Sequence, residues 1–211
     1  MPGIDAFDKH ASHYDQWFDR HPAVFQSELA ALKALYPGGK CAVEIGLGTG
    51  RFAQALGITY GVEPAQAMAR LAVSRGINTV VAKAENLPFN DHCFNTAVMV
   101  TAICFFDDIN TAMRETRRIL QPGGSIIIGF IDRDTPLGQD YLTRKDDNAF
   151  YSHATLYSSP MVREILITAG FSDIGFMQTL AGDYKTMTRP ETPHEGYGNG
   201  GFVVVRAAIS P

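Results

Sequence analysis

The sequence predicts an α/β fold built on a mostly parallel sheet, and three observations lead to this expectation. Short apolar runs that suit buried strands alternate with helical segments between residues 41 and 131. This alternation is typical of right-handed βαβ units, whose strands lie parallel in one sheet. Two later strand-like runs, 171–180 and 201–209, have no helical segment between them, so we expect an antiparallel pair at that end.

The spacing of apolar side chains predicts the individual elements. A helix over 22–36 is indicated by apolar residues at helical spacing, namely Phe25, Leu29, Leu32 and Tyr36. Strands are expected at seven places, 41–45, 58–62, 77–82, 94–101, 125–131, 171–180 and 201–209. Helices are expected at 65–74, 108–120 and 160–169, and the segment 51–56 reads as the start of a helix. The remaining long stretches, 132–158 and 181–200, read as irregular, the first with room for a short helix.

Composition excludes several classes of protein. The 211 residues are 45% hydrophobic and 19% charged, which suits one globular domain with a substantial core. The net charge of -4 argues against a nucleic-acid binder. No apolar run approaches the ~20 residues of a membrane-spanning helix, and residues 1–8 lack the pattern of a signal peptide. Cys41, Cys93 and Cys104 form no CxxC pair, so we expect a reducing cytoplasm and no metal.

A glycine-rich loop follows the first predicted strand. The segment Glu44-Ile45-Gly46-Leu47-Gly48-Thr49-Gly50 spaces its glycines by two, which lets the backbone approach a ligand closely. The helix that begins behind the loop favours negative groups on that ligand. Arg51 follows Gly50, so the third glycine of the dinucleotide fingerprint G-x-G-x-x-G is missing. Glu44 needs a partner if it is buried, either a ligand ammonium or the backbone amides of the loop.

An acidic residue ends the second predicted strand. Glu63, followed by Pro64, stands 17 residues after Gly46. A carboxylate at this tip can accept hydrogen bonds from both ribose hydroxyls of an adenosine. This position suits NAD and S-adenosylmethionine equally, and a plain tight turn with a surface Glu is the alternative without a ligand.

Five motifs in order give the chain a resemblance to the class I S-adenosylmethionine-dependent methyltransferases, in particular their small-molecule branch, methyltransferase type 11. The segments that carry it are the glycine loop 44–50, Gly61-Val62-Glu63-Pro64 with Met68, Ala84-Glu85-Asn86-Leu87-Pro88-Phe89, Arg118-Ile119-Leu120-Gln121-Pro122-Gly123-Gly124, and Ala169-Gly170-Phe171. The resemblance implies a Rossmann-like, seven-stranded, mostly parallel sheet with helices on both faces and a C-terminal antiparallel strand. It covers roughly residues 40 to 175 and the last strand.

The resemblance also implies S-adenosylmethionine as cofactor, S-adenosylhomocysteine as product, and a role for each matching residue. The residues expected to bind the cofactor are Glu44, Gly46, Gly48, Gly50, Glu63, Pro64, Met68, Ala84, Glu85, Leu87, Thr101 and Ala102. Many relatives have Asp where Lys83 stands, so contact with the adenine amine would fall to Glu85 or to the backbone.

Three segments can reach the carboxyl ends of the strands, where a substrate of such a sheet binds. Their aromatic residues predict a pocket for an apolar or aromatic small molecule, although the same residues could simply pack the N-terminal arm onto the sheet. This expected pocket comprises Tyr14, Trp17, Phe18, Phe105, Phe106, Tyr151 and Tyr157. An alcohol or phenol acceptor would need a base, and the candidates are His153, Tyr14 and Asp132.

The sequence therefore predicts an enzyme that transfers a methyl group from S-adenosylmethionine to a small molecule by in-line displacement. Such a reaction depends on positioning and on a dry site, because it consumes positive charge. A NAD(P)-dependent oxidoreductase and a non-catalytic cofactor-binding module are the alternatives. We expect one domain over 1–211, a monomer or homodimer. Its parts are an N-terminal arm and helix (1–36), a cofactor-binding half (40–131), a substrate-side insertion (132–158) and a C-terminal helix and hairpin (159–211).

Overall fold

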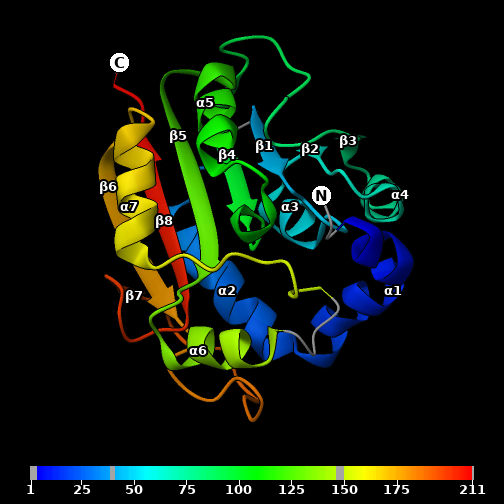
Figure 1. The fold of residues 1–211 in the computed structure, drawn as a ribbon, viewed down its shortest axis with the longest axis vertical. Coiled ribbons are helices and arrows are strands. Elements are labelled where there is room, and N and C mark those ends of the chain that lie inside the picture. Colours follow the sequence, from blue (N-terminus) through cyan, green and yellow to red (C-terminus); the bar gives the residue numbers. More distant parts are fainter. Residues whose placement is uncertain (1–3, 39–40, 146–149, 211) are drawn as a thin grey trace.

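The computed structural model describes residues 4–38, 41–145 and 150–210, which are arranged around one sheet of eight strands (Figure 1). The strand order is β3-β2-β1-β4-β5-β8-β6-β7. The strands are β1 (Ala42–Ile45), β2 (Tyr60–Val62), β3 (Asn78–Val80), β4 (Phe94–Val100), β5 (Leu120–Ile131), β6 (Ser172–Thr179), β7 (His194–Glu195) and β8 (Phe202–Ala208).

Strands β1 to β5 pair in parallel, and the remaining pairs are antiparallel. β1 pairs with both β2 and β4, so the order of the strands reverses at β1. The loops that follow β1 and β4 therefore leave the sheet in opposite directions and open a crevice between them, where ligands of open α/β sheets bind. β8 lies between β5 and β6 and is antiparallel to both, which confirms the antiparallel C-terminal pair.

Helices cover both faces of this sheet. They are α1 (Ile4–Arg20), α2 (Pro22–Leu35), α3 (Arg51–Leu56), α4 (Gln66–Ser74), α5 (Ile109–Ile119), α6 (Pro136–Thr143) and α7 (Ser159–Thr168), with a 3-10 turn η1 (Ile103–Phe105). α5 and α7 pack on one face, where Met113 and Leu166 are fully buried. α2 and α3 pack on the other, where Leu32 and Phe52 meet the sheet. No helix within the described ranges has the length and apolar character needed to cross a membrane.

Two features differ from the sequence prediction. The sheet has an eighth strand, because His194 and Glu195 pair with Gln178 and Met177 in the segment we expected to be a loop. A two-residue strand has no alternation that could reveal it. The N-terminal arm also forms a helix along residues 4–20, with a non-helical conformation at His10.

Helix α1 is fastened to the rest of the molecule by two carboxylates. Asp8 accepts a hydrogen bond of 2.7 Å from the backbone N–H of Ala67, in the first turn of α4. Asp15 accepts from Thr49, Arg51 and Arg75 at 2.6 to 3.0 Å. Burial alone would raise the pKa of Asp15, but these hydrogen bonds outweigh it and hold the pKa at about 2. α1 therefore lies firmly against the glycine loop and α4.

Candidate active site

The glycine loop leaves β1 in a conformation that glycine alone adopts readily. Gly46 and Gly48 have φ of 72° and 55°. A Cβ on Gly46 would lie 2.6 Å from the Cβ of Ala102, so the loop also needs glycine for its close contact with the segment after β4. The backbone N–H groups of Gly46 and Leu47 donate to the carbonyl of Val62, which joins the loop to the end of β2.

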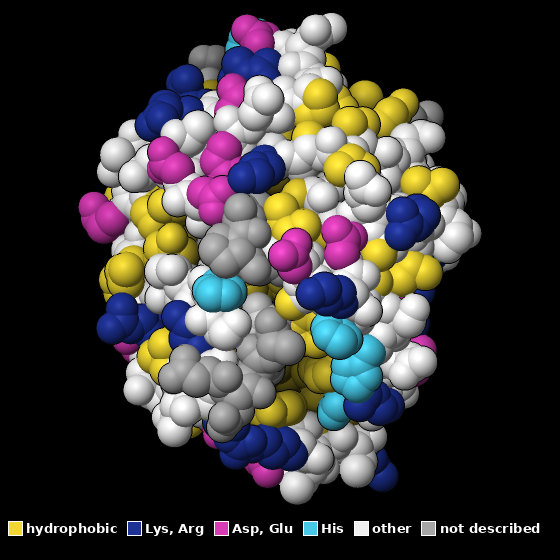
Figure 2. Space-filling view, turned by 45° about the vertical axis from the view of Figure 1, so that its right-hand side comes forward, with side chains coloured by type: hydrophobic (Ala, Val, Ile, Leu, Met, Phe, Trp, Pro, Cys, Tyr) yellow, Lys and Arg dark blue, Asp and Glu magenta, His cyan; other side chains and the backbone are white. Residues whose placement is uncertain are grey.

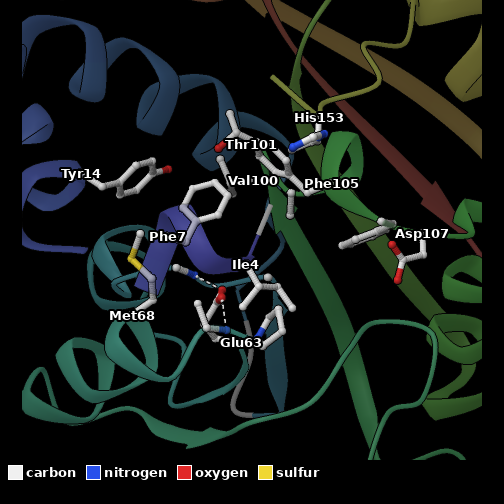
Figure 3. Close-up of a pocket in the computed structure, with 16 residues that line it drawn as sticks. Ile4, Phe7, Tyr14, Glu63, Met68, Val100, Thr101, Phe105, Asp107 and His153 are labelled. Carbon is white, nitrogen blue, oxygen red and sulfur yellow. Dashed lines mark hydrogen bonds between the residues drawn. The ribbon is translucent and has the colours of Figure 1, made fainter. Parts of the chain in front are cut away.

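Glu63 holds the tip of β2 against this loop. Its two carboxylate oxygens accept hydrogen bonds of 2.9 Å from the N–H groups of Gly48 and Ala65, drawn as dashed lines in Figure 3. Burial raises the pKa of Glu63 to about 7, against the effect of the two backbone hydrogen bonds. Each oxygen keeps further acceptor capacity for a ligand, because a carboxylate accepts about four hydrogen bonds.

The glycine-loop cavity, of about 130 Å³, opens at these carboxyl ends (Figure 3). Ile4 and Phe7 reach into it from α1, and Asp107 and His153 lie on its opposite side. Its other lining residues are Tyr14, Gly46, Gly48, Glu63, Pro64, Ala65, Met68, Val100, Thr101, Ala102, Phe105 and Phe106.

A second cavity, the Glu28 cavity, has a volume of about 230 Å³ and lies between α1, α2 and α6. It is lined by His13, Tyr14, Trp17, Phe18, Arg20, Glu28, Phe52, Thr101, Ile131, Tyr141, Phe150 and Tyr151. On the face seen in Figure 2, hydrophobic side chains line a hollow bordered by histidines. The two cavities share Tyr14 and Thr101, so they adjoin at the end of β4.

Thr101 and Tyr14 form this shared wall. Thr101 has a φ of 49°, a left-handed conformation that costs a non-glycine residue energy and occurs often at functional sites. The Tyr14 hydroxyl points toward Thr101 (Figure 3). Burial raises the pKa of Tyr14 above its ordinary range, while the interaction with the Thr101 side chain works in the opposite direction. Tyr14 therefore stays a neutral phenol.

Seven of the twelve residues expected to bind the cofactor line the glycine-loop cavity. They are Gly46, Gly48, Glu63, Pro64, Met68, Thr101 and Ala102. The other five, which do not line it, are Glu44, Gly50, Ala84, Glu85 and Leu87.

These five residues instead make contacts that hold the fold together. Glu44 is buried against α3, where it interacts with the backbone of Ala53, and one of its oxygens has no partner among the described residues. Gly50 is the N-cap of α3, and a Cβ there would lie 2.5 Å from Ile77. Ala84 and Leu87 belong to the core below α5. Glu85 accepts from the N–H groups of Asp107 and Asp108, so it holds the turn before α5.

The three candidate bases lie in different surroundings. Tyr14 lines both cavities, and His153 is an exposed residue at the rim of the glycine-loop cavity. Asp132 lines neither cavity, and its carboxylate accepts from the N–H of Asp134 and from the N–H and hydroxyl of Ser159. It thus fixes the start of α7, and we do not retain it as a base.

The aromatic residues expected in a substrate pocket are divided between the cavities. Phe105 and Phe106 line the glycine-loop cavity, whereas Trp17, Phe18 and Tyr151 line the Glu28 cavity. Tyr157 lies behind Thr101 in a separate void of about 10 Å³, too small for a substrate. The expected single pocket is therefore two compartments that meet at Tyr14.

Sequence reasoning missed several lining residues. Ile4 and Phe7 enter the glycine-loop cavity because residues 4–20 fold as a helix over it. Glu28 lies on the buried side of α2, between Phe25 and Leu32 at helical spacing. The sequence could have indicated Glu28, because an acidic residue stands there among apolar residues at helical spacing.

Comparison with known proteins agrees with this geometry. A family model described as a methyltransferase domain matches residues 43–128. An uncharacterized protein of Methanocaldococcus jannaschii is 41% identical over 204 residues, which are 97% of this chain and 98% of that protein. An O-methyltransferase of Aspergillus sclerotiorum is 32% identical over 103 residues, 43% of this chain and 39% of that protein.

A solved structure extends the match to the whole fold. The crystal structure of an S-adenosylmethionine-dependent methyltransferase of Thermotoga maritima, described as a possible histamine N-methyltransferase, has a TM-score of 0.94 and 42% identity. The match covers 97% of this chain and 98% of that one. The sheet order, the glycine loop and these relatives together identify the chain as a member of the class I methyltransferase family, whose methyl donor is S-adenosylmethionine.

Proposed function

We propose that this protein transfers a methyl group from S-adenosylmethionine, bound in the glycine-loop cavity, to a small-molecule acceptor in the Glu28 cavity. The main observation in support of this proposal is that the two cavities share a wall. Tyr14 and Thr101 line both cavities, so a donor on one side and an acceptor on the other would meet at the end of β4. The aromatic lining of the second cavity suits an apolar or aromatic acceptor.

The residues of the glycine-loop cavity fit the donor. Glu63 offers free acceptor positions to ribose hydroxyls, and its own geometry is fixed by Gly48 and Ala65. Gly46 lets the methionyl part approach the backbone, since any side chain there would collide with Ala102. Phe7, which reaches into the cavity from α1, would cover the bound donor.

The chain would act mainly by positioning and by excluding water. When bound, S-adenosylmethionine supplies an electrophilic methyl group on a positively charged sulfur. Thr101 and Ala102 would hold this end of the donor against the wall between the cavities. Aligning the two reactants and keeping the site dry can supply much of the rate enhancement of such a displacement.

The similar proteins leave the acceptor atom open. One is described as a possible histamine N-methyltransferase and another as an O-methyltransferase. Tyr14 would help to form the walls of the two cavities and would not act as a base, because its pKa is raised above the ordinary range of a phenol. His153 is exposed and lies at the rim of the glycine-loop cavity.

Calorimetric titration with S-adenosylhomocysteine tests the donor site, and two glycines provide a matched pair of variants. Gly46 and Gly57 both have a φ of 72°, so alanine strains the backbone equally at each. A Cβ on Gly57 meets no atom of the described residues within 4 Å, whereas a Cβ on Gly46 would collide with Ala102. We expect Gly46→Ala to weaken binding by about a hundredfold or more and Gly57→Ala to leave it within about threefold, given the cost of overpacking.

Thermal unfolding of both variants shows whether they fold. Equal affinities in the two variants would remove the glycine loop from the donor site. Absence of binding to the unmodified protein at millimolar S-adenosylhomocysteine would overturn the proposed function. Binding without methyl transfer to any compound of a broad metabolite panel would favour the non-catalytic module, and binding of NADH instead would favour the oxidoreductase.

A further inference from the structure

The Glu28 cavity contains one acidic side chain among its described lining residues. Glu28 extends from α2 and is 6% exposed. It shares the cavity with two basic groups, His13 and Arg20, both on α1. Arg20 directs its guanidinium to the backbone carbonyls of Gln16 and His13, at 3.3 and 3.4 Å, and not to Glu28.

The carboxyl of Glu28 has no partner within the part of the chain that the structure describes. Among residues 4–38, 41–145 and 150–210, no hydrogen bond or ion pair reaches it, and burial alone accounts for its raised pKa of about 8. Asp15, Glu63 and Asp132 differ, since each of these carboxyls accepts at least two hydrogen bonds. Glu44 also keeps one oxygen without a partner among the described residues, but it lies against α3 and lines neither cavity. Burying a polar group without a partner is costly, so an unsatisfied carboxyl that faces a cavity indicates a ligand that satisfies it.

The walls around Glu28 define the charge of this ligand. Trp17 and Phe18 from α1, Tyr141 from α6 and Tyr151 line the same cavity. Aromatic faces attract organic cations, most strongly where water is excluded. The carboxyl and the aromatic faces therefore favour the same kind of group, a positively charged nitrogen attached to an apolar body.

We infer that the acceptor is a small organic amine, whose ammonium group pairs with Glu28 and whose apolar body lies among the aromatic side chains of this cavity. The inference rests on the proposed function and adds the class of substrate. The nitrogen would be the methylated atom, because Glu28 lines the same cavity as Thr101, which belongs to the wall shared with the glycine-loop cavity.

Glu28 would also prepare the nitrogen for the reaction. An ammonium group has no lone pair, so it must first lose a proton, and the carboxylate of Glu28 takes it. The nitrogen lone pair then forms the bond to the methyl carbon while the methyl–sulfur bond breaks, and that electron pair stays on sulfur. The product leaves as an N-methylated ammonium, and Glu28 returns its proton to solvent. A carboxyl with a pKa of about 8 suits this task near neutral pH.

The test compares two probes of the same shape, 2-phenylethylamine and 2-phenylethanol, with protein saturated by S-adenosylhomocysteine. Binding is measured by calorimetry at pH 7 in two buffers of different ionisation enthalpy, which reports protons released. The variants are Glu28→Gln and the control Glu164→Gln, an exposed residue of α7 that lines neither cavity.

We expect the unmodified protein and Glu164→Gln to bind the amine at least about tenfold more tightly than the alcohol. They should release close to one proton, because a carboxyl protonated in the free protein becomes the partner of an ammonium. Glu28→Gln should lose both the preference and the proton release. From pH 6 to 7.5 the affinity of the unmodified protein for the amine should rise about tenfold per unit, and above pH 8 it should level off.

The groups that face Glu28 and could add to this profile are His13, Tyr14 and Arg20 on α1, Tyr141 on α6 and Tyr151. Burial raises the pKa values of the three tyrosines above their ordinary range, so they stay neutral throughout it. Glu28→Gln separates the contribution of Glu28 from that of His13.

Three results would overturn the inference while the proposed function stands. These are failure of the amine to bind to the S-adenosylhomocysteine complex, equal or tighter binding of the alcohol, and an unchanged amine preference in a folded Glu28→Gln variant. Failure of S-adenosylhomocysteine itself to bind would overturn the proposed function, and the inference with it.

Discussion

The first two helices each carry a carboxyl that is withdrawn from solvent, partly for Asp15 of α1 and almost fully for Glu28 of α2, and the surroundings of the two carboxyls are opposite. Asp15 of α1 lies beside the glycine loop, where Thr49, Arg51 and Arg75 donate to it. Glu28 of α2 lies in the cavity on the other side of α1, where none of the described residues donates to it. The carboxyl that holds α1 in place is thus paired with donors, whereas the carboxyl that faces a cavity has no donor among the described residues.

The two regions also respond to pH in opposite directions. Hydrogen bonds that outweigh burial hold the pKa of Asp15 at about 2, whereas burial raises that of Glu28 to about 8. Asp15 therefore stabilises the fold as a carboxylate, and Glu28 is tolerated as a neutral acid. Measurements of unfolding free energy against pH, on variants of each residue, test this difference.

The largest change in the free energy of unfolding is expected for Glu28→Gln. Because the folded pKa of Glu28 lies above its ordinary value of 4.5, its contribution to stability is complete below pH 4.5 and is lost as pH rises to 8. The free energy of unfolding of Glu28→Gln, relative to the unmodified protein, should rise by up to about 4 kcal/mol between pH 5 and pH 8. Urea unfolding at pH 5, 6.5 and 8 measures it.

Glu164→Gln is the control, since its side chain is exposed on α7. It should change the free energy of unfolding by the same small amount at each pH. If the difference for Glu28→Gln were also constant over this range, Glu28 would not be a neutral buried acid, and the contrast with Asp15 would disappear.

A smaller effect of opposite sign is expected for Asp15→Asn. The folded pKa of Asp15 lies below its ordinary value of 3.8, so its contribution is present above pH 3.8 and is lost as pH falls through about 2. The substitution should cost about 2 kcal/mol at pH 7 and much less at pH 2.5, as measured by urea unfolding at both pH values.

Asp19→Asn provides the matched control for this cluster. Asp19 also pairs with Arg51, but its side chain is 63% exposed, and exposed ion pairs contribute less than about 1 kcal/mol. An equal cost for both substitutions would mean that α1 is not held mainly through Asp15.

The parallel half of the fold was predictable because its signals are local. The helix α3 begins at Arg51, in the segment where a helix start is predicted, and the β1, β2 and β4 strands lie within the predicted runs. The strands are set by apolar runs, and glycine follows both β1 and the helix, at Gly46 and Gly57. β7 was missed, because two residues paired with the distant strand β6 carry no periodicity of their own.

The parts of the candidate site that local motifs at strand ends form were predictable from the sequence. The parts where side chains from distant segments meet were not. Gly46 and Glu63 belong to motifs at strand ends, and both line the glycine-loop cavity. Leu87 lies in a motif too, but its side chain turns into the core. Glu28 faces a cavity only because α1 and α6 pack around it. The residues next to Glu28 in the sequence do not indicate that these two helices enclose it.

The smallest effect is expected at the wall between the two regions. Tyr14→Phe keeps the ring that separates the cavities and removes the hydroxyl that faces Thr101. The loss of this polar interaction should lower the free energy of unfolding by about 1 kcal/mol and leave the affinity for S-adenosylhomocysteine within about threefold. Urea unfolding and calorimetry measure the two quantities.

Tyr60→Phe is the control, because Tyr60 is 43% exposed on β2. The cost of Tyr14→Phe should not vary between pH 6 and pH 9, since the phenol of Tyr14 stays neutral throughout that range. A cost that changed with pH would show that Tyr14 exchanges a proton with its surroundings. The wall would then take part in the chemistry that we assign to Glu28, and the two cavities would be coupled through Tyr14 rather than merely divided by it.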